Sequence, residues 1–223
     1  KYPQDVIKIS PASNPPTSDH VPCYTGRDIN RYSVTFGGLF CFFDEKARQG
    51  GCWDPKMHKA KGKILVRQIG LFPEGAIDER GFAVLNTAFM ILPRPDSLEP
   101  LVVLGVLNSR CIRFYWENRF QDDRRTFPKI KGTYLKRLPI PNIPAARAEE
   151  ISRGVFGLME LKTIRDTESE RFIDIDGQID ACVAQFYDLE EDEYRRILDK
   201  THAGRNFTEK ALSHFRALSH QER

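Results

Sequence analysis

The chain has 223 residues, 40% hydrophobic and 29% charged, and this ordinary globular composition excludes a wholly disordered protein. No apolar run approaches the roughly 20 residues that a membrane-spanning helix needs, and the N-terminus lacks the apolar segment of a secretory signal. The formal net charge of +3 is unevenly divided: residues 1–150 hold 23 Lys and Arg against 16 Asp and Glu (+7), and residues 151–223 hold 11 against 15 (−4), so an anionic partner is expected on the first part.

The first half of the chain has the pattern of short strands separated by turns. Residues 1–21 are rich in Pro and Ser and predict a linker or an extended arm. Strands rich in aromatic and β-branched residues are predicted at 33–43, 63–70 and 82–92. A Gly pair inside the first of them indicates a bulge or a hairpin, and the polar stretch 44–62 predicts a loop.

The period of the apolar residues then changes. Leu101, Leu104 and Leu107 recur at helical spacing, and together with Cys111 they predict one helix over 98–119 with a buried face. The stretch 120–141 is basic and predicts an irregular connection.

From about Ala145 onwards the chain is predicted to be helical. Two apolar stripes mark the first helices, one made by Ile151, Val155, Leu158 and Leu161 and the other by Ile175, Ile179, Val183 and Phe186. Asp188 followed by Glu191 resembles a capping box that opens a third helix, and Thr208 is expected to cap a last one. Strands followed by helices predict an α+β fold, with a mostly antiparallel or mixed sheet and a helical C-terminal extension.

Motifs that would support catalysis are missing, so no catalytic residue is predicted. Asn14-Pro15-Pro16-Thr17 is similar to the Asn-Pro-Pro-aromatic loop of amino-methyltransferases, but Thr17 cannot stack on a flipped base and the sequence has no Gly-rich cofactor loop. The adjacent Asp122 and Asp123 are interpreted as solvated charge, because a nuclease metal site needs carboxylates that converge from separate elements.

Cysteine usage argues against a disulfide framework. The cysteines are scattered and odd in number, at Cys23, Cys41, Cys52, Cys111 and Cys182. This pattern favours a reducing cytoplasm. Cys52 and His58 lie close together, but no second pair at C-x-x-C-like spacing accompanies them, so no metal site is predicted.

Four stretches of the first part interleave basic residues with Asn, Gln, His or Tyr: 24–32, 55–58, 59–68 and 119–136. Lys and Arg neutralise DNA phosphates, while Arg can also fork onto guanine and Asn or Gln onto adenine. The residues predicted to contact DNA phosphates or bases are Arg27, Arg31, Lys61, Lys63, Arg67, Arg124, Arg125, Lys129 and Lys131. The prediction requires these side chains to gather on one face that the acidic helices leave open.

The order of several motifs resembles a known family. These motifs are Tyr24-x-Gly26-Arg27-Asp28-Ile29-x-x-Tyr32, Lys63-Ile-Leu-Val-Arg-Gln-Ile-Gly70, Leu104-Gly-Val-Leu-Asn-Ser109, Phe127-Pro-Lys-Ile-Lys-Gly132 and Leu135-Lys-Arg-Leu-Pro-Ile-Pro141. Together with the tail at 179–193, they resemble the TaqI-like C-terminal specificity domain, a target recognition domain. That domain follows the catalytic domain in adenine-specific DNA methyltransferases and in fused type IIG restriction-modification enzymes.

The resemblance implies a target recognition domain at 22–141 that binds the major groove of double-stranded DNA, with a linker at 1–21 and a helical extension at 142–223. Its implied partner is the catalytic methyltransferase domain of the same parent protein, which flips out adenine and methylates it from S-adenosylmethionine. The chain itself is expected to hold no cofactor and to be a piece of a longer cytoplasmic protein. Whether the parent also cleaves DNA, as a type II restriction enzyme does, stays open.

Three alternatives remain at this stage. The chain could be a type I-like specificity subunit, although such subunits usually carry two recognition domains with long spacer helices. It could be a protein-interaction module of a phage-defence complex, which would need an exposed apolar patch. A self-sufficient methyltransferase would bind S-adenosylmethionine by itself.

Overall fold

The computed structural model describes residues 6–8, 14, 17–42, 52, 54–94, 96–120 and 128–221. Most of the predicted linker at 1–21 and the Asp122-Asp123 pair therefore lie outside the described residues, as do two predicted DNA contacts, Arg124 and Arg125. Within the described ranges, no helix has the length and apolarity needed to cross a membrane.

The strands are short and occupy the first part of the chain, as predicted. They are β1 (Val6–Lys8), β2 (His20–Tyr24), β3 (Ile29–Asn30), β4 (Ser33–Val34), β5 (Leu39–Phe42), β6 (Lys63–Arg67), β7 (Gly75–Asp78), β8 (Ala83–Val84) and β9 (Ala88–Ile91). The predicted strand at 33–43 is divided into β4 and β5, and the one at 82–92 into β8 and β9.

In the part of the chain that the structure describes, these strands form three small sheets. One has the order β1-β5-β2-β8, the second pairs β3 with β4, and the third has the order β7-β6-β9. In the third sheet β6 is central and runs antiparallel to both neighbours, so that Leu65 lies opposite Ala76 on one side and Met90 on the other. Ile64, Leu65 and Val66 are completely buried, as expected for a central strand that is covered on both faces.

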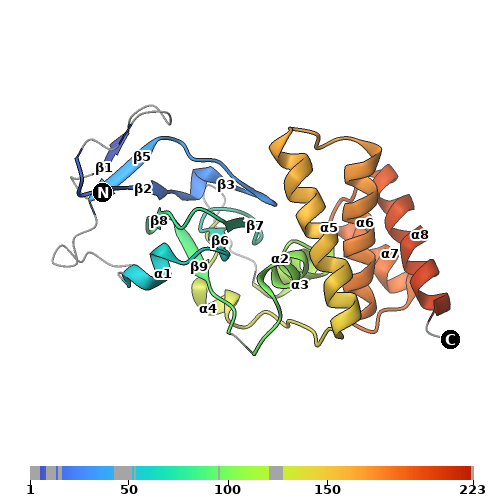
Figure 1. The fold of residues 1–223 in the computed structure, drawn as a ribbon. Helices are drawn as coiled ribbons and strands as arrows, with labels where there is room; N and C mark the ends of the chain where they lie inside the picture. The colour runs from blue at the N-terminus through green and yellow to red at the C-terminus, as the bar shows by residue number, and fades with distance from the viewer. Residues whose placement is uncertain are drawn as a thin grey trace.

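Most of the helices follow the strands, and the combination confirms the α+β prediction. A short 3-10 helix η1 (Gly26–Asp28) lies among the strands, and the α-helices are α1 (Pro55–Lys59), α2 (Pro100–Leu107), α3 (Arg110–Arg119), α4 (Gly132–Leu135), α5 (Ala145–Thr163), α6 (Glu170–Gln185), α7 (Glu191–Lys200) and α8 (Arg205–Gln221). Figure 1 shows the strands at one end of the molecule, α5 to α8 side by side at the other, and α2 and α3 between them.

The prediction of a single helix over 98–119 is wrong, because the helix is interrupted at Asn108 and Ser109. The Asn108 side chain accepts a hydrogen bond from Gly75 N at 2.9 Å and donates one to Gly75 O at 3.1 Å, which ties the end of α2 to strand β7. Ser109 then caps α3 by accepting from Ile112 N at 3.2 Å. Two hydrogen bonds of Asn108 to a distant strand and one local bond of Ser109 to the backbone of α3 thus replace a helical turn.

Two predicted helix starts are also displaced. The capping box of α7 is formed by Glu190 and Glu193, while Asp188 has a positive φ of 52° in the turn before it. Thr208 lies inside α8, which already begins at Arg205. A carboxylate cap was recognisable for α7, but carboxylates recur so closely here that their spacing did not fix its position.

One of the hydrophobic clusters of the described residues crosses from the sheet to the helical extension. It includes Ile64 and Val66 of β6, Val106 of α2, and Ile151 and Val155 of α5. Helix α2 lies so close to α5 that a Cβ on Gly105 would meet the Ile151 Cγ2 atom at 2.8 Å. The helices of the extension therefore support the sheet through α2, and the packing is continuous across residue 141.

Candidate nucleic-acid interface

The C-terminal end of β6 is a meeting point of segments that are far apart in the sequence. Gly26, at the start of η1, donates its backbone N–H to Thr87 Oγ1 at 2.9 Å. The Gln68 backbone N–H donates to the Thr87 carbonyl, also at 2.9 Å. The loop between β8 and β9 thereby connects the segment that carries Arg27 to the end of β6.

A third segment joins on the other side. Ile130 donates its backbone N–H to Gln68 O at 2.8 Å, and Gly70 donates to Pro128 O at 3.1 Å. These bonds flank an antiparallel bridge between Ile69 and Lys129. Parts of three of the four predicted basic stretches, 24–32, 59–68 and 119–136, are therefore joined at one place, the first through the Thr87 hydroxyl and the other two by backbone hydrogen bonds.

We call this place the β6 end. Its members are the exposed Arg27, Ile69, Leu71, Asn86, Lys129 and Lys131 and the half-buried Gln68. The aliphatic side chains are conspicuous among them, since Ile69 is 49% exposed and Leu71 is 69% exposed. The β6 end thus offers cations, amides and apolar side chains, which are the groups that contact phosphates, base edges and thymine methyl groups.

The other predicted residues are distributed differently. Arg67 is half-buried and forms an ion pair with Glu74, although its Nε is buried without a hydrogen-bond partner in the described residues. Lys61 is exposed but precedes β6, at the opposite end of the strand. At about 3.3 Å per residue, the strand from Lys63 to Arg67 separates the two ends by about 13 Å.

Lys63 is placed inside the protein and has no access to a phosphate. Its side chain is fully buried and forms an ion pair with Asp78, which is also fully buried. The ammonium donates to the carbonyls of His58 at 2.6 Å and Ala60 at 3.0 Å as well. Lys63 therefore holds the sheet to the α1 loop, and we remove it from the set of candidate DNA contacts.

Arg31 is likewise committed to an internal contact. Its guanidinium binds both carboxylate oxygens of Asp176 in α6, at 2.6 and 2.7 Å, and donates twice to the carbonyl of Asn108. Burial opposes the charged form, but the attraction of Asp176 raises the pKa of Arg31 above its ordinary value. Here an acidic helix covers a predicted contact, and Arg31 joins the sheet to the helical extension.

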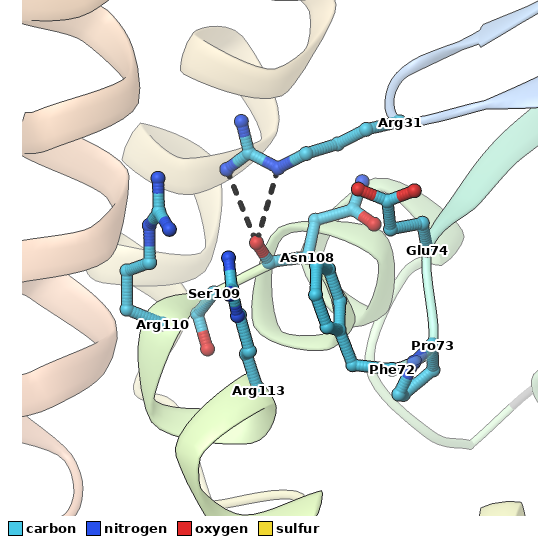
Figure 2. A pocket seen from close by; sticks show the side chains of 8 residues that line it. All are labelled: Arg31, Phe72, Pro73, Glu74, Asn108, Ser109, Arg110 and Arg113. Atoms are coloured by element: carbon cyan, nitrogen blue, oxygen red, sulfur yellow. Dashed lines mark hydrogen bonds between the residues drawn. The ribbon is translucent and has the colours of Figure 1, made fainter. Parts of the chain in front are cut away.

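A small pocket adjoins Arg31, between the β3–β4 turn, the β6–β7 loop and the junction of α2 and α3 (Figure 2). Figure 2 shows Arg31, Arg110 and Arg113 approaching this pocket from different directions, with Phe72 and Glu74 on the loop side. The Arg113 guanidinium lies 4.0 Å from the centre of the Phe72 ring, which fixes the base of the β6–β7 loop. The sequence did not point to Arg110 and Arg113, because they were assigned to the middle of one long helix. The Ser109 cap was the available signal.

The described residues thus form an α+β arrangement in which a mixed polar and apolar loop surface lies on a small sheet with a helical support. The family model of the TaqI-like C-terminal specificity domain matches residues 21–140, and the chain belongs to this family. The resemblance stated from the motifs is thereby confirmed. The chain is a DNA-recognition domain of the methyltransferase or restriction-modification type, and the β6 end lies within the matched segment. The search of curated proteins gave no match.

Proposed function

We propose that the chain recognises a specific sequence of duplex DNA through the β6 end and presents that DNA to an adenine-specific methyltransferase domain of the same parent protein. The observation that carries the proposal is the set of hydrogen bonds that joins Gly26, Gln68, Thr87 and Ile130, all between backbone groups except the one that Gly26 donates to the Thr87 hydroxyl. They hold the cations and the potential base readers in a fixed relation, which direct readout of base edges requires.

Roles within the β6 end follow from side-chain chemistry. Arg27, Lys129 and Lys131 neutralise phosphates and supply most of the affinity. The amide of Gln68 or Asn86 can pair with the exposed edge of adenine in the major groove, and the exposed Ile69 and Leu71 can contact thymine methyl groups. Phosphate contacts set the register, and the amide and apolar contacts select the bases.

The parent supplies the chemistry in this proposal. The described residues hold no group of three or more Cys, His, Asp or Glu side chains that could bind a metal. S-adenosylmethionine would bind to the catalytic domain of the parent, which flips the target adenine from the duplex. All five cysteines are free, which supports a reducing cytoplasmic compartment for the parent.

The test is the salt dependence of DNA binding. A duplex selected from a random library by the wild-type chain is titrated with the wild type and with the variant Arg27→Ala/Lys129→Ala/Lys131→Ala. If each cation contacts one phosphate, the slope of log K against log salt should fall in magnitude by about 2.7. Binding should also weaken for every duplex sequence.

The matched control removes three exposed arginines from the helical extension, Arg153, Arg205 and Arg216. It lowers the net charge equally and should leave the slope unchanged. Equal slopes for the wild type and the β6-end variant would refute the proposed surface. Absence of duplex binding by the wild type at low salt would instead favour a protein-interaction module.

A further inference from the structure

The pocket in Figure 2, which we call the arginine pocket, is lined by more positively than negatively charged side chains. Three arginines, Arg31, Arg110 and Arg113, contribute to it together with one acidic side chain, Glu74. Its volume of about 80 Å³ admits a small group rather than a base pair. Glu74 is already engaged by Arg67, so it does not neutralise the pocket arginines.

Two of the three guanidiniums keep unused donors. Within the described residues, Arg113 hydrogen-bonds only through Nε, to Glu117 at 2.9 Å, and Arg110 only through Nη1, to the carbonyl of Thr201 at 3.1 Å. An arginine carries five N–H donors, so several remain for a ligand. Arg31 differs, because Asp176 and Asn108 occupy its donors. It therefore contributes positive electrostatic potential to the pocket rather than hydrogen bonds to a ligand.

Electrostatics supports an anionic ligand. Burial lowers the pKa of Arg110, the nearby Asp180 opposes that effect, and repulsion from Arg31 and Arg113 lowers the pKa further. Asp180 is itself engaged, since it accepts from Arg110 N at 2.6 Å and from the Tyr194 hydroxyl at 2.7 Å. A negative group in the pocket would relieve the repulsion between the guanidiniums.

The arginine pocket is next to the β6 end. Val66 pairs with Gly75, so Glu74 of the pocket and Arg67 at the end of β6 lie beside each other and form an ion pair. The loop that follows β6 carries the exposed Ile69 and Leu71 on the way to Phe72, which lines the pocket. A duplex held at the β6 end would therefore bring its backbone towards this opening.

We propose that the arginine pocket binds one phosphodiester group of the DNA backbone, with Arg110 and Arg113 as the donors. This inference rests on the proposed function and adds a defined anchoring contact to it. Guanidinium groups match the oxygens of a phosphate in forked geometry, and such a contact fixes register without reading sequence. The pocket thus sets where along the duplex the side chains of the β6 end meet the bases.

The experiment neutralises single phosphates. A selected duplex is synthesised in versions that each carry one methylphosphonate, and the affinity of the full chain for each version is measured. For the wild type, one position near the recognised sequence should weaken binding about tenfold, the loss expected for one charge-assisted hydrogen-bonded contact. The variant Arg113→Gln should bind the unmodified duplex about tenfold more weakly and should show no further loss at that position.

Arg153→Gln is the matched control, because Arg153 also pairs with a glutamate one helical turn away but lies in α5 of the extension. It should reproduce the wild-type profile. Urea unfolding of both variants checks that they fold, and Arg113→Lys, which retains the charge but lacks the fork, should recover only part of the loss. If Arg113→Gln keeps the wild-type profile at every phosphate, the arginine pocket is not the anchor. If the β6-end variant keeps its salt slope, the proposed function itself fails.

Discussion

Replacing Lys63 with Met should destabilise the fold without changing the salt dependence of DNA binding. Lys63 belongs to a sequence stretch that resembles a DNA contact, yet its ammonium is buried against Asp78 and two backbone carbonyls. The substitution retains most of the side-chain volume and removes the charge. It therefore separates a structural role from a phosphate contact.

The magnitude follows from the partners that remain. Breaking a buried ion pair by removing one member typically costs about 3–5 kcal/mol. Asp78 keeps three backbone donors, from Arg80 at 2.9 Å, Gly81 at 3.1 Å and Phe82 at 3.0 Å, which moderates its loss. The carbonyls that Lys63 leaves unpaired act in the opposite direction. Because these two effects offset each other, we expect the free energy of unfolding to fall by about 3–5 kcal/mol.

Urea denaturation of Lys63→Met, Asp78→Asn and the double variant measures this cost. Because the two side chains contact each other, the double variant should be destabilised by about 1–3 kcal/mol less than the sum of the single variants. DNA binding of folded Lys63→Met should show the wild-type salt slope. A cost below about 1 kcal/mol, or a slope reduced by about 0.9, would refute the structural assignment of Lys63.

Two further predictions concern the β6 end and the α1 loop. Gly26→Ala places a Cβ 2.6 Å from Thr87 O, so it should displace η1, lower the free energy of unfolding by about 1–3 kcal/mol and weaken DNA binding. In the control Gly204→Ala the new Cβ meets nothing within 4 Å, so stability and binding should change much less. Equal effects of the two substitutions in urea unfolding and DNA-binding assays would contradict this prediction. Burial lowers the pKa of His58, whose Nδ1 accepts a hydrogen bond from Val84 N at 3.0 Å. Neutral His58 should therefore stabilise the folded protein above the ordinary histidine pKa of about 6.5. This contribution should be lost as the pH falls through the lowered pKa of the folded state. Urea unfolding between about pH 7.5 and 5 should show this loss in the wild type and much less of it in His58→Gln.

The fold class could be predicted because local patterns and tertiary packing agree in most elements. The period of the apolar residues located α5 and α6, and β-branched runs located β6. The break at Asn108 escaped prediction because its cause is a pair of hydrogen bonds to Gly75, which is 33 residues away. A side chain that caps a helix and binds a distant strand leaves no periodic signal in its own neighbourhood.

The candidate contacts show the same limit more clearly. Lys61 and Lys63 are two residues apart in one basic run, yet the first is exposed and the second is completely buried. Arg31 is covered by Asp176, which is 145 residues further along the chain. Charge and local pattern could propose all three residues, but only long-range pairing decides which of them solvent or DNA can reach.

These long-range pairs also explain why an acidic extension accompanies a domain that recognises a polyanion. Asp176 and Asp180 of α6 are both buried. Asp176 binds Arg31 of the sheet region, and Asp180 accepts a hydrogen bond from the first backbone N–H of α3. These two carboxylates of α6 therefore hold the recognition sheet and α3 in place. Gly105 lets α2 approach α5 closely and completes this attachment with apolar packing. Direct readout needs side chains that do not shift relative to the phosphate contacts. A helical extension that is anchored by buried pairs supplies that rigidity at the sheet while its remaining acidic surface disfavours binding of DNA elsewhere on the molecule.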